Sequence, residues 1–160
     1  WSISGDNFAV SNKDPYATFT AKQLTGKTED VVVQASTKTR TTEVTYIDGL
    51  HFKAPTQFNT RTQASPEPAK KGHKINVQGQ LAVVSYKQDA WTGDAGQNLK
   101  LQFKTKGGHY KTVKTVKSGQ YGFAQTTVTA KKSGTYRFIF AGNSTATSAK
   151  ASGDYVKVTK

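Results

Sequence analysis

Cysteine and methionine are both absent from the 160-residue sequence. Without cysteine, the chain cannot form a disulfide scaffold, a thiolate zinc site, an iron–sulfur cluster or a thiol nucleophile. Long apolar runs are missing as well, since stretches such as 31–33 and 138–141 fall far short of the roughly 20 residues that a membrane-spanning helix needs. We therefore expect no membrane span. Because the chain starts at Trp1, we expect a mature or trimmed product from which any targeting segment has been removed.

Leucine and glutamate are scarce, with 5 and 3 copies, whereas the sequence holds 13 Val, 4 Ile and 23 Thr. Branching at Cβ restricts χ1 in a helix and packs well on the pleated face of a sheet. No segment has convincing helical periodicity. The composition therefore predicts an all-β protein.

Charge is distributed unevenly along the chain. Residues 1–64 carry 7 basic and 6 acidic side chains, while residues 65–160 carry 16 basic and 4 acidic ones, so the second part holds nearly all of the net charge of +13. Pro66 and Pro68 lie where the composition changes, and proline removes a donor from any β-ladder. We expect a domain boundary near 62–66, with domains at 1–63 and 64–160.

The first part predicts a small β-sandwich-like domain of four or five short strands. Apolar and polar residues alternate over 17–21, 31–35 and 44–46, as in half-buried strands. Asp48-Gly49 lies between two strand-like segments, 41–47 and 50–58. Because Asp-Gly suits a type I′ turn, this pair predicts a β-hairpin.

The second part predicts an immunoglobulin-like β-sandwich. Short β-like segments recur every 8 to 12 residues with turn residues between them, which is typical of that architecture. The expected strands are 74–82, 98–104, 110–117, 124–130, 135–141 and 154–159.

Alternation within these segments predicts the core. Every second residue of 98–103 and 135–140 is apolar, so one side of each strand should face inward: Leu99, Leu101, Phe103, Tyr136, Phe138 and Phe140. In 110–117 the valines Val113 and Val116 are three residues apart, which breaks the alternation and predicts a β-bulge or a short bend.

Several motifs of the second part recur together in one known group of domains: Ser65-Pro66-Glu67-Pro68, Val77-Gln78-Gly79-Gln80-Leu81, Gly96 to Phe103, Tyr110-Lys111-Thr112-Val113, Ser133-Gly134-Thr135-Tyr136-Arg137 and Tyr155-Val156-Lys157-Val158. With these motifs, residues 64–160 resemble the bacterial immunoglobulin-like repeats of secreted and surface proteins of actinobacteria. The resemblance implies an exported, non-catalytic module used for adhesion, spacing or ligand binding. The segment 81–96 is longer than that pattern, and residues 1–63 match no family in this way.

Lysines on the strands around the Gly107-Gly108 turn form the first candidate site: Lys100, Lys104, Lys106, Lys111, Lys114 and Lys117. A cluster of ammonium groups attracts anionic polymers and releases their counterions on binding. The same lysines could instead keep a sheet edge from aggregating. Only 3 of the 23 basic residues are Arg, which disfavours sequence-specific nucleic-acid recognition.

Aromatic residues in expected loops form the second candidate site: Tyr86, Trp91 and Tyr121. Planar rings there could stack on sugars or bases, or could cap the ends of the sandwich. Asp89 and Asp94 lack the spacing of a calcium loop, and the three histidines are widely separated, so no metal site is expected.

Motifs for catalysis are lacking. The chain has no Gly-x-Ser-x-Gly elbow, no phosphate-binding loop and too few glutamates for a paired-carboxylate site. No spacing selects the Lys–Asn pair of an intramolecular isopeptide bond. We expect no enzyme activity and no cofactor.

The sequence therefore predicts a secreted, monomeric binding module for an anionic extracellular partner, such as a cell-wall polymer or an acidic protein surface. Two alternatives stay open. One is a structural, adhesion or protein-recognition protein of the cell surface, and the other is a carbohydrate-binding module that uses Trp91 and Tyr86.

Overall fold

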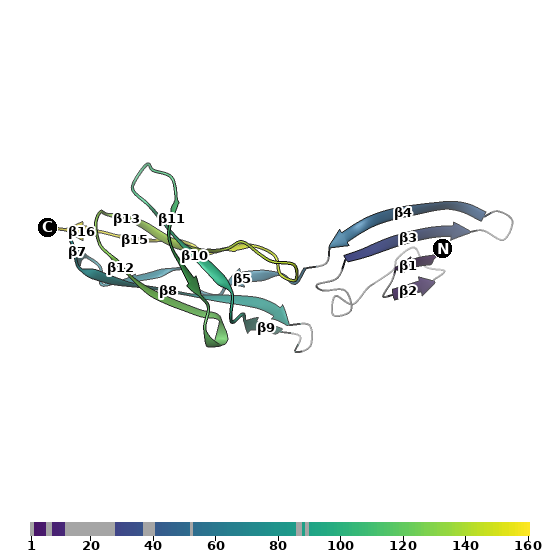
Figure 1. Ribbon diagram of the computed structural model, residues 1–160, viewed down its shortest axis with the longest axis horizontal. Helices are drawn as coiled ribbons and strands as arrows, with labels where there is room; N and C mark the ends of the chain where they lie inside the picture. Colours follow the sequence, from purple (N-terminus) through teal and green to yellow (C-terminus); the bar gives the residue numbers. More distant parts are fainter. Residues whose placement is uncertain are drawn as a thin grey trace. The chain divides into compact units, whose positions relative to one another are not determined.

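The computed structural model describes the backbone of residues 2–5, 8–11, 28–36, 41–51, 53–85, 88 and 90–160, and the side chains of these residues from 53 onward. The chain divides into two compact units, Trp1–Ala54 and Pro55–Lys160 (Figure 1). Within the described residues, β-strands make up almost all of the regular structure, and one short 3₁₀ turn is present. The predicted all-β class is confirmed.

The described residues of the first unit form one antiparallel sheet in the order β2-β1-β3-β4. Its strands are β1 (Ser2–Gly5), β2 (Phe8–Ser11), β3 (Thr28–Ser36) and β4 (Thr41–His51). Val31 to Ala35 lie in β3 and Val44 to Tyr46 in β4, as their alternation predicts. The expected strand at 17–21 falls outside the described residues.

The predicted hairpin turn at Asp48-Gly49 is wrong. Both residues lie inside β4, which continues through them to His51. Glu29 pairs with Leu50 and Val31 with Ile47, so Asp30 alone faces Asp48 and Gly49 together. This is the pattern of a β-bulge, in which one strand holds an extra residue. Asp-Gly marks a local irregularity in either case, and the long pairing with β3 decides which one forms.

The second unit is a sandwich of two sheets connected by short turns (Figure 1). In one sheet, β12 (Phe123–Thr129), β6 (Gln63–Ser65), β5 (Thr56–Phe58) and β9 (Ala90–Gly93) all pair with the long strand β8 (Lys74–Ser85). The other sheet has the order β11-β10-β13-β14, and β15 also pairs with β13. Its strands are β11 (Lys111–Lys117), β10 (Asn98–Lys104), β13 (Gly134–Phe140), β14 (Ala149–Lys150) and β15 (Asp154–Val156). A parallel pair of β7 (Ala69–Lys70) and β16 (Val158–Thr159) completes the unit.

The boundary between the units lies before Pro55, about eight residues N-terminal to the segment that the sequence indicated. The reason is strand pairing, because β5 pairs with residues 81–83 of β8 and β6 pairs with residues 76–78. The prolines at 66 and 68 therefore follow the first strands of the second unit. With the boundary at this position, residues 1–54 hold 6 basic and 6 acidic side chains, so all of the net positive charge lies in residues 55–160.

The core lies between the two sheets where alternation predicted it. Leu99, Leu101 and Phe138 are fully buried, while Tyr136 and Phe140 are at most 5% exposed. Phe103 is the exception, since it is only partly buried at the margin of the core.

The predicted β-bulge in the strand from 110 to 117 is confirmed. Leu101 of β10 pairs with Lys114, and the next residue, Gln102, pairs with Thr112. Val113 is therefore the extra residue of β11, and its side chain is 48% exposed.

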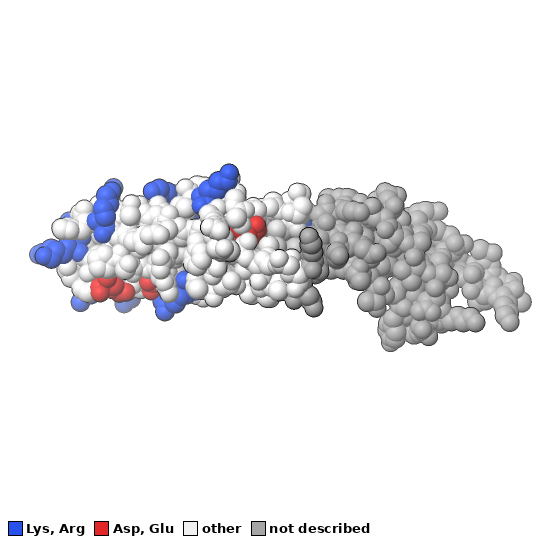
Figure 2. Space-filling model, turned by 90° about the horizontal axis from the view of Figure 1, so that it is seen from below, with Lys and Arg blue, Asp and Glu red and all other residues white. Residues whose placement is uncertain are grey.

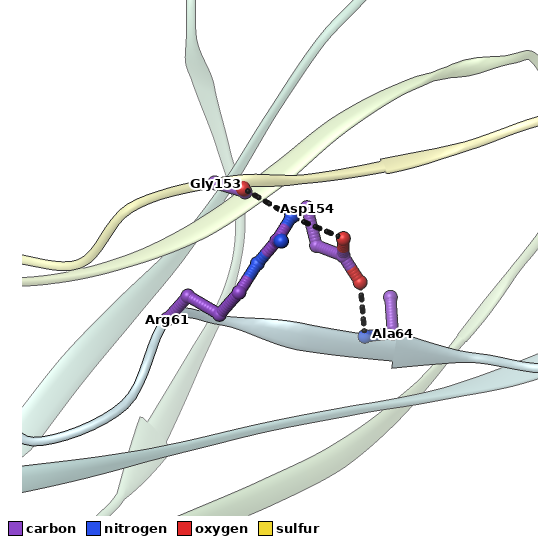
Figure 3. A network of polar contacts seen from close by, with 4 residues as sticks. All are labelled: Arg61, Ala64, Gly153 and Asp154. Atoms are coloured by element: carbon purple, nitrogen blue, oxygen red, sulfur yellow. Dashed lines mark hydrogen bonds and ion pairs between the residues drawn. The ribbon is translucent and has the colours of Figure 1, made fainter.

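One open side of the sandwich is closed by polar contacts between the sheets (Figure 3). The Asp154 carboxylate on β15 accepts hydrogen bonds from the Arg61 guanidinium at 2.8 Å and from the Ala64 backbone N–H on β6 at 2.9 Å. Arg61 also donates to the Gly153 carbonyl. Nearby, the buried Thr62 hydroxyl accepts a hydrogen bond from the backbone N–H of Phe138 at 3.0 Å. The segment before Ser65 therefore makes contacts that stabilise the second unit.

Candidate functional site

The register of β10 and β11 divides the predicted lysine stripe between two faces. Residues directly opposite each other on neighbouring strands point to the same side of a sheet. Lys100 and Lys104 point away from the core, on the side opposite the buried Leu99 and Leu101. Lys117 pairs with Asn98 and shares this outer face.

Lys111 and Lys114 lie on the other side of the sheet. Lys114 pairs with the buried Leu101 and Lys111 pairs with Phe103, so both extend along the open edge of the sandwich. The Lys114 ammonium donates to the Thr127 carbonyl of β12 at 3.4 Å. Lys106 lies in the turn that joins β10 and β11. The six lysines therefore do not form one surface. In a regular strand Lys111 and Lys114, three residues apart, would lie on opposite faces, and the bulge at Val113 brings both to the side of Leu101 and Phe103.

Two other basic residues join the outer face. Ile139 pairs with both Lys100 and Lys150, and Arg137 pairs with Gln102. The Arg137 guanidinium lies 3.6 Å from the centre of the Tyr110 ring, and the Lys104 ammonium lies 4.7 Å from it. Through these cation–π contacts, the Arg137 guanidinium and the Lys104 ammonium already have a partner within the protein, the Tyr110 ring. On the face drawn in Figure 2, Lys and Arg side chains stand apart along the margins, with uncharged surface and a few Asp or Glu side chains between them.

A cleft lined by aromatic and amide side chains is a second candidate site, and its volume is about 720 Å³. Three rings around it are unusually open to solvent: Trp91 at 44%, Tyr121 at 65% and Phe123 at 55%. The other residues are small or carry an uncharged polar side chain: Asn59, Gln80, Gln88, Thr92, Gly93, Ala95 and Gln120. None of these lining residues carries a charge.

The cleft forms where β9 and β12 meet end to end along one edge of β8. Trp91 on β9 pairs with Val84, and Phe123 on β12 pairs with Gln80. Val84 and Gln80 are four residues apart, so both rings point to the outer side of the sheet. Strand geometry separates them by about 13 Å, at about 3.3 Å per residue.

Tyr121 occupies the junction between these strands in a fixed and strained conformation. It belongs to the 3₁₀ turn η1 (Gln120–Gly122) and has φ 55° and ψ 23°, the left-handed region that residues other than glycine rarely adopt. A Cβ on Gly93 would approach the Tyr121 backbone to 2.1 Å, so only glycine there lets the turn lie against the sheet. The Gln80 amide donates to the Tyr121 carbonyl at 3.0 Å.

A hydrogen-bonded loop supports the turn from the other side. The Ser118 hydroxyl donates to the Asp94 carbonyl at 2.7 Å, and the Gln97 amide donates to the Asp94 carboxylate at 3.1 Å. Burial raises the pKa of Asp94 above its ordinary value of 3.8, and the hydrogen bond from Gln97 opposes part of that rise. These contacts hold the turn that carries Tyr121 in place, while Trp91 and Phe123 lie on strands paired with β8, the kind of support that a binding site requires.

The sequence identified two members of this cleft and missed a third. Trp91 and Tyr121 were predicted as stacking residues, and the structure brings them together. Tyr86 lies outside the described residues. Phe123 was missed because the expected strand began at residue 124, so no face of the sheet was assigned to this ring. Here Phe138 fills the space between the sheets and comes within 3.0 Å of a Cβ placed on Gly79. Gly79 pairs with Ala124, so only small residues fit on that side and Phe123 faces solvent.

Metal-binding and membrane-spanning features were also sought over the described part of the chain. No group of three or more His, Asp or Glu side chains there could hold a metal ion. No helix in that part is long and apolar enough to cross a membrane.

No protein-family model and no curated protein matches this chain. The resemblance of residues 64–160 to actinobacterial immunoglobulin-like repeats stays a prediction.

Proposed function

We propose that the second unit is a carbohydrate-binding module that holds an uncharged glycan in the cleft of Trp91, Tyr121 and Phe123. The observation that supports it is the exposure of three aromatic rings along one edge of β8, one from β9 and two from the continuous stretch of η1 and β12. Exposed apolar rings cost solvation free energy unless a partner covers them. A linear ligand with repeated apolar faces would cover all three.

Amide side chains complete the chemistry of the proposed site. Asn59, Gln80, Gln88 and Gln120 line the same cleft, and each amide can both donate to and accept from hydroxyl groups. Sugars present such hydroxyls around the edge of a ring and C–H groups on its faces. Because the lining residues that the structure describes carry no charge, the cleft favours neutral sugars over acidic ones.

Binding to insoluble glycans tests this proposal. The full chain is incubated with a panel of neutral polysaccharides, including cellulose, chitin, starch and β-1,3-glucan, and the bound fraction is measured by sedimentation at low and at moderate salt. We expect binding to at least one polymer with little salt dependence. Replacement of Trp91, Tyr121 or Phe123 by Ala should weaken that binding about tenfold each, since aromatic stacking contributes about 1–3 kcal/mol per ring.

Tyr155→Ala is the matched control. Tyr155 is 48% exposed but lies on β15 in the other sheet. The Tyr155→Ala variant should bind the same polymer as tightly as the wild type. Loss of binding in this control, or failure of every neutral polymer to bind, would contradict the proposal.

A second candidate function uses the outer face of the sheet that contains β10. Lys100, Lys104 and Lys117 share this face with Arg137 and Lys150, which supports recognition of an anionic polymer by diffuse attraction. A variant with all five residues replaced by Gln should no longer bind heparin or teichoic acid. A variant in which Lys111 and Lys114 are replaced by Gln should keep most of that binding. Binding that does not weaken with salt contradicts this candidate.

We further propose that the protein is exported and acts at the cell surface. The sequence resemblance carries this proposal. The strand order supports the resemblance, because two antiparallel sheets with β8 facing β10 and β13 follow the plan of immunoglobulin-like sandwiches. Mass spectrometry of culture medium and of cell-wall fractions tests it, and recovery only from the cell interior would contradict it.

A further inference from the structure

A groove with an apolar floor opens between the two sheets, where β11 and β12 form their edges. Its volume is about 610 Å³, within the range of sites for small organic ligands. Phe103, Tyr136, Val113 and Val128 supply the apolar part of the lining. The Phe103 and Tyr136 rings contact each other, with their centres 4.6 Å apart.

The bulge of β11 contributes to this groove. A regular strand would alternate past position 113, but the extra residue places Val113 beside the gap with 48% of its surface exposed. Farther along the same edge, Lys114 reaches across to the Thr127 carbonyl. The groove is thus open at the bulge and bridged at Lys114.

Three ammonium groups contribute to the lining beside the apolar floor. Lys74, Lys131 and Lys132 line the groove, and no carboxylate is among its described lining residues. The carboxylates of Asp94 and Asp154 make their hydrogen bonds elsewhere, to Gln97 and Arg61. Burial raises the pKa of the Tyr136 phenol, so this side chain remains a neutral hydroxyl at physiological pH.

We propose that this groove binds an amphipathic carboxylate, with the apolar chain of a fatty acid on Phe103, Tyr136 and Val113 and its head group among Lys74, Lys131 and Lys132. Apolar surface and cationic rim together select such a ligand, because an uncharged alkane leaves the ammonium groups without a partner and a small anion leaves the floor exposed. This site is separate from the aromatic cleft, which lies on the outer side of the sheet that contains β8.

Titration of the full chain with dodecanoate tests the proposal, at concentrations below those that form micelles, with binding followed by calorimetry. We expect saturable binding of one molecule, and weaker binding of dodecanol because it lacks the carboxylate. Val113→Asp should reduce the affinity about tenfold or more, because it places a charge beside the apolar chain. Lys131→Gln and Lys132→Gln should each reduce it about two- to fivefold.

Lys157→Gln is the matched control, since Lys157 is an exposed lysine outside the groove. It should bind dodecanoate like the wild type. The proposal is overturned if dodecanoate does not bind, or if Val113→Asp binds it unchanged while the thermal unfolding of that variant shows an intact fold. Binding of an acidic, leucine-rich peptide in place of dodecanoate would also overturn it. Glycan binding is measured on the same variants and should not change.

Discussion

Tyr121 combines an unfavourable backbone conformation with a ring that is largely exposed. A left-handed conformation costs a residue other than glycine about 1–2 kcal/mol, and the exposed ring recovers little of that by packing. Gln80, Gly93 and Gly122 hold the turn in place around it. Strain retained under an exposed aromatic ring favours a role in binding over a role in stability.

Tyr121→Gly separates these two roles. Glycine relieves the strain, but the greater conformational entropy of the unfolded chain lowers the free energy of unfolding by about 0.4–1 kcal/mol. We therefore expect the free energy of unfolding to stay unchanged or to rise by up to about 1 kcal/mol. Glycan binding should weaken about tenfold in the same variant, as for Tyr121→Ala, because the stacking ring is removed. Urea denaturation and polymer sedimentation measure the two effects. A fall in stability of more than about 1 kcal/mol would show instead that the ring packs to support the fold.

Asp94 gives the molecule a defined pH dependence. Because burial raises its pKa in the folded state, the folded protein takes up a proton before the unfolded chain does as pH falls. The Asp94 contribution therefore destabilises the fold above the raised pKa and is relieved as pH falls toward 3.8.

Asp94→Asn should remove this dependence while the amide oxygen still accepts from Gln97. We expect the variant to be more stable than the wild type at neutral pH, with the difference shrinking as pH is lowered through the acidic range. Urea denaturation at a series of pH values measures that difference. A difference that grows toward low pH would contradict the assignment.

At the scale of elements, the turn η1 depends on glycine at position 122. Gly122 has φ +75°, and a Cβ there would lie 1.9 Å from the Leu81 carbonyl oxygen. Gly107 also has a positive φ, +73°, but nothing lies within 4 Å of its Cβ position. Substitution at Gly107 therefore measures the cost of a positive φ alone, whereas substitution at Gly122 adds the cost of steric overlap with β8.

Gly122→Ala should destabilise the protein by about 1–3 kcal/mol more than Gly107→Ala does, because overpacking adds to the cost of the left-handed conformation. It should also weaken glycan binding by displacing Tyr121, whereas Gly107→Ala should not. Thermal unfolding and the sedimentation assay measure both effects. Equal destabilisation by the two substitutions would show that the turn moves freely away from β8.

At the scale of the whole molecule, the second unit needs the residues before its two prolines. Thr62 satisfies a buried backbone N–H of Phe138, Ala64 belongs to the core, and β5 and β6 cover one edge of β8. Arg61 adds the ion pair with Asp154 that joins the two sheets.

A fragment of residues 55–160 should therefore fold, while a fragment of residues 64–160 should be largely unfolded or much less stable. The shorter fragment leaves a buried N–H without a partner, at about 1–3 kcal/mol, and exposes an edge of β8. Circular dichroism melting and the dispersion of amide resonances compare the two. Similar melting temperatures would place the boundary where the proline-rich segment suggested.

Composition and alternation were sufficient for the all-β class, for most strands of the second unit and for the buried side of β10 and β13, because these depend on the period of two along each strand. The bulge at Val113 was also predictable, since it breaks that period locally. The choice of bulge over hairpin at Asp48-Gly49 came from pairing with β3, which the local sequence does not encode.

Tertiary structure alone decided which side chains meet on a surface. Pairing of Lys111 with Phe103 and of Lys114 with Leu101 placed both lysines on the side opposite Lys100. The bulk of Phe138 against Gly79 turned Phe123 outward to join Trp91 and Tyr121. The side of the sheet on which a side chain lies, and the residues that it contacts, depend on pairing between segments far apart in the chain. The tendency of a segment to form a β-strand depends on that segment by itself.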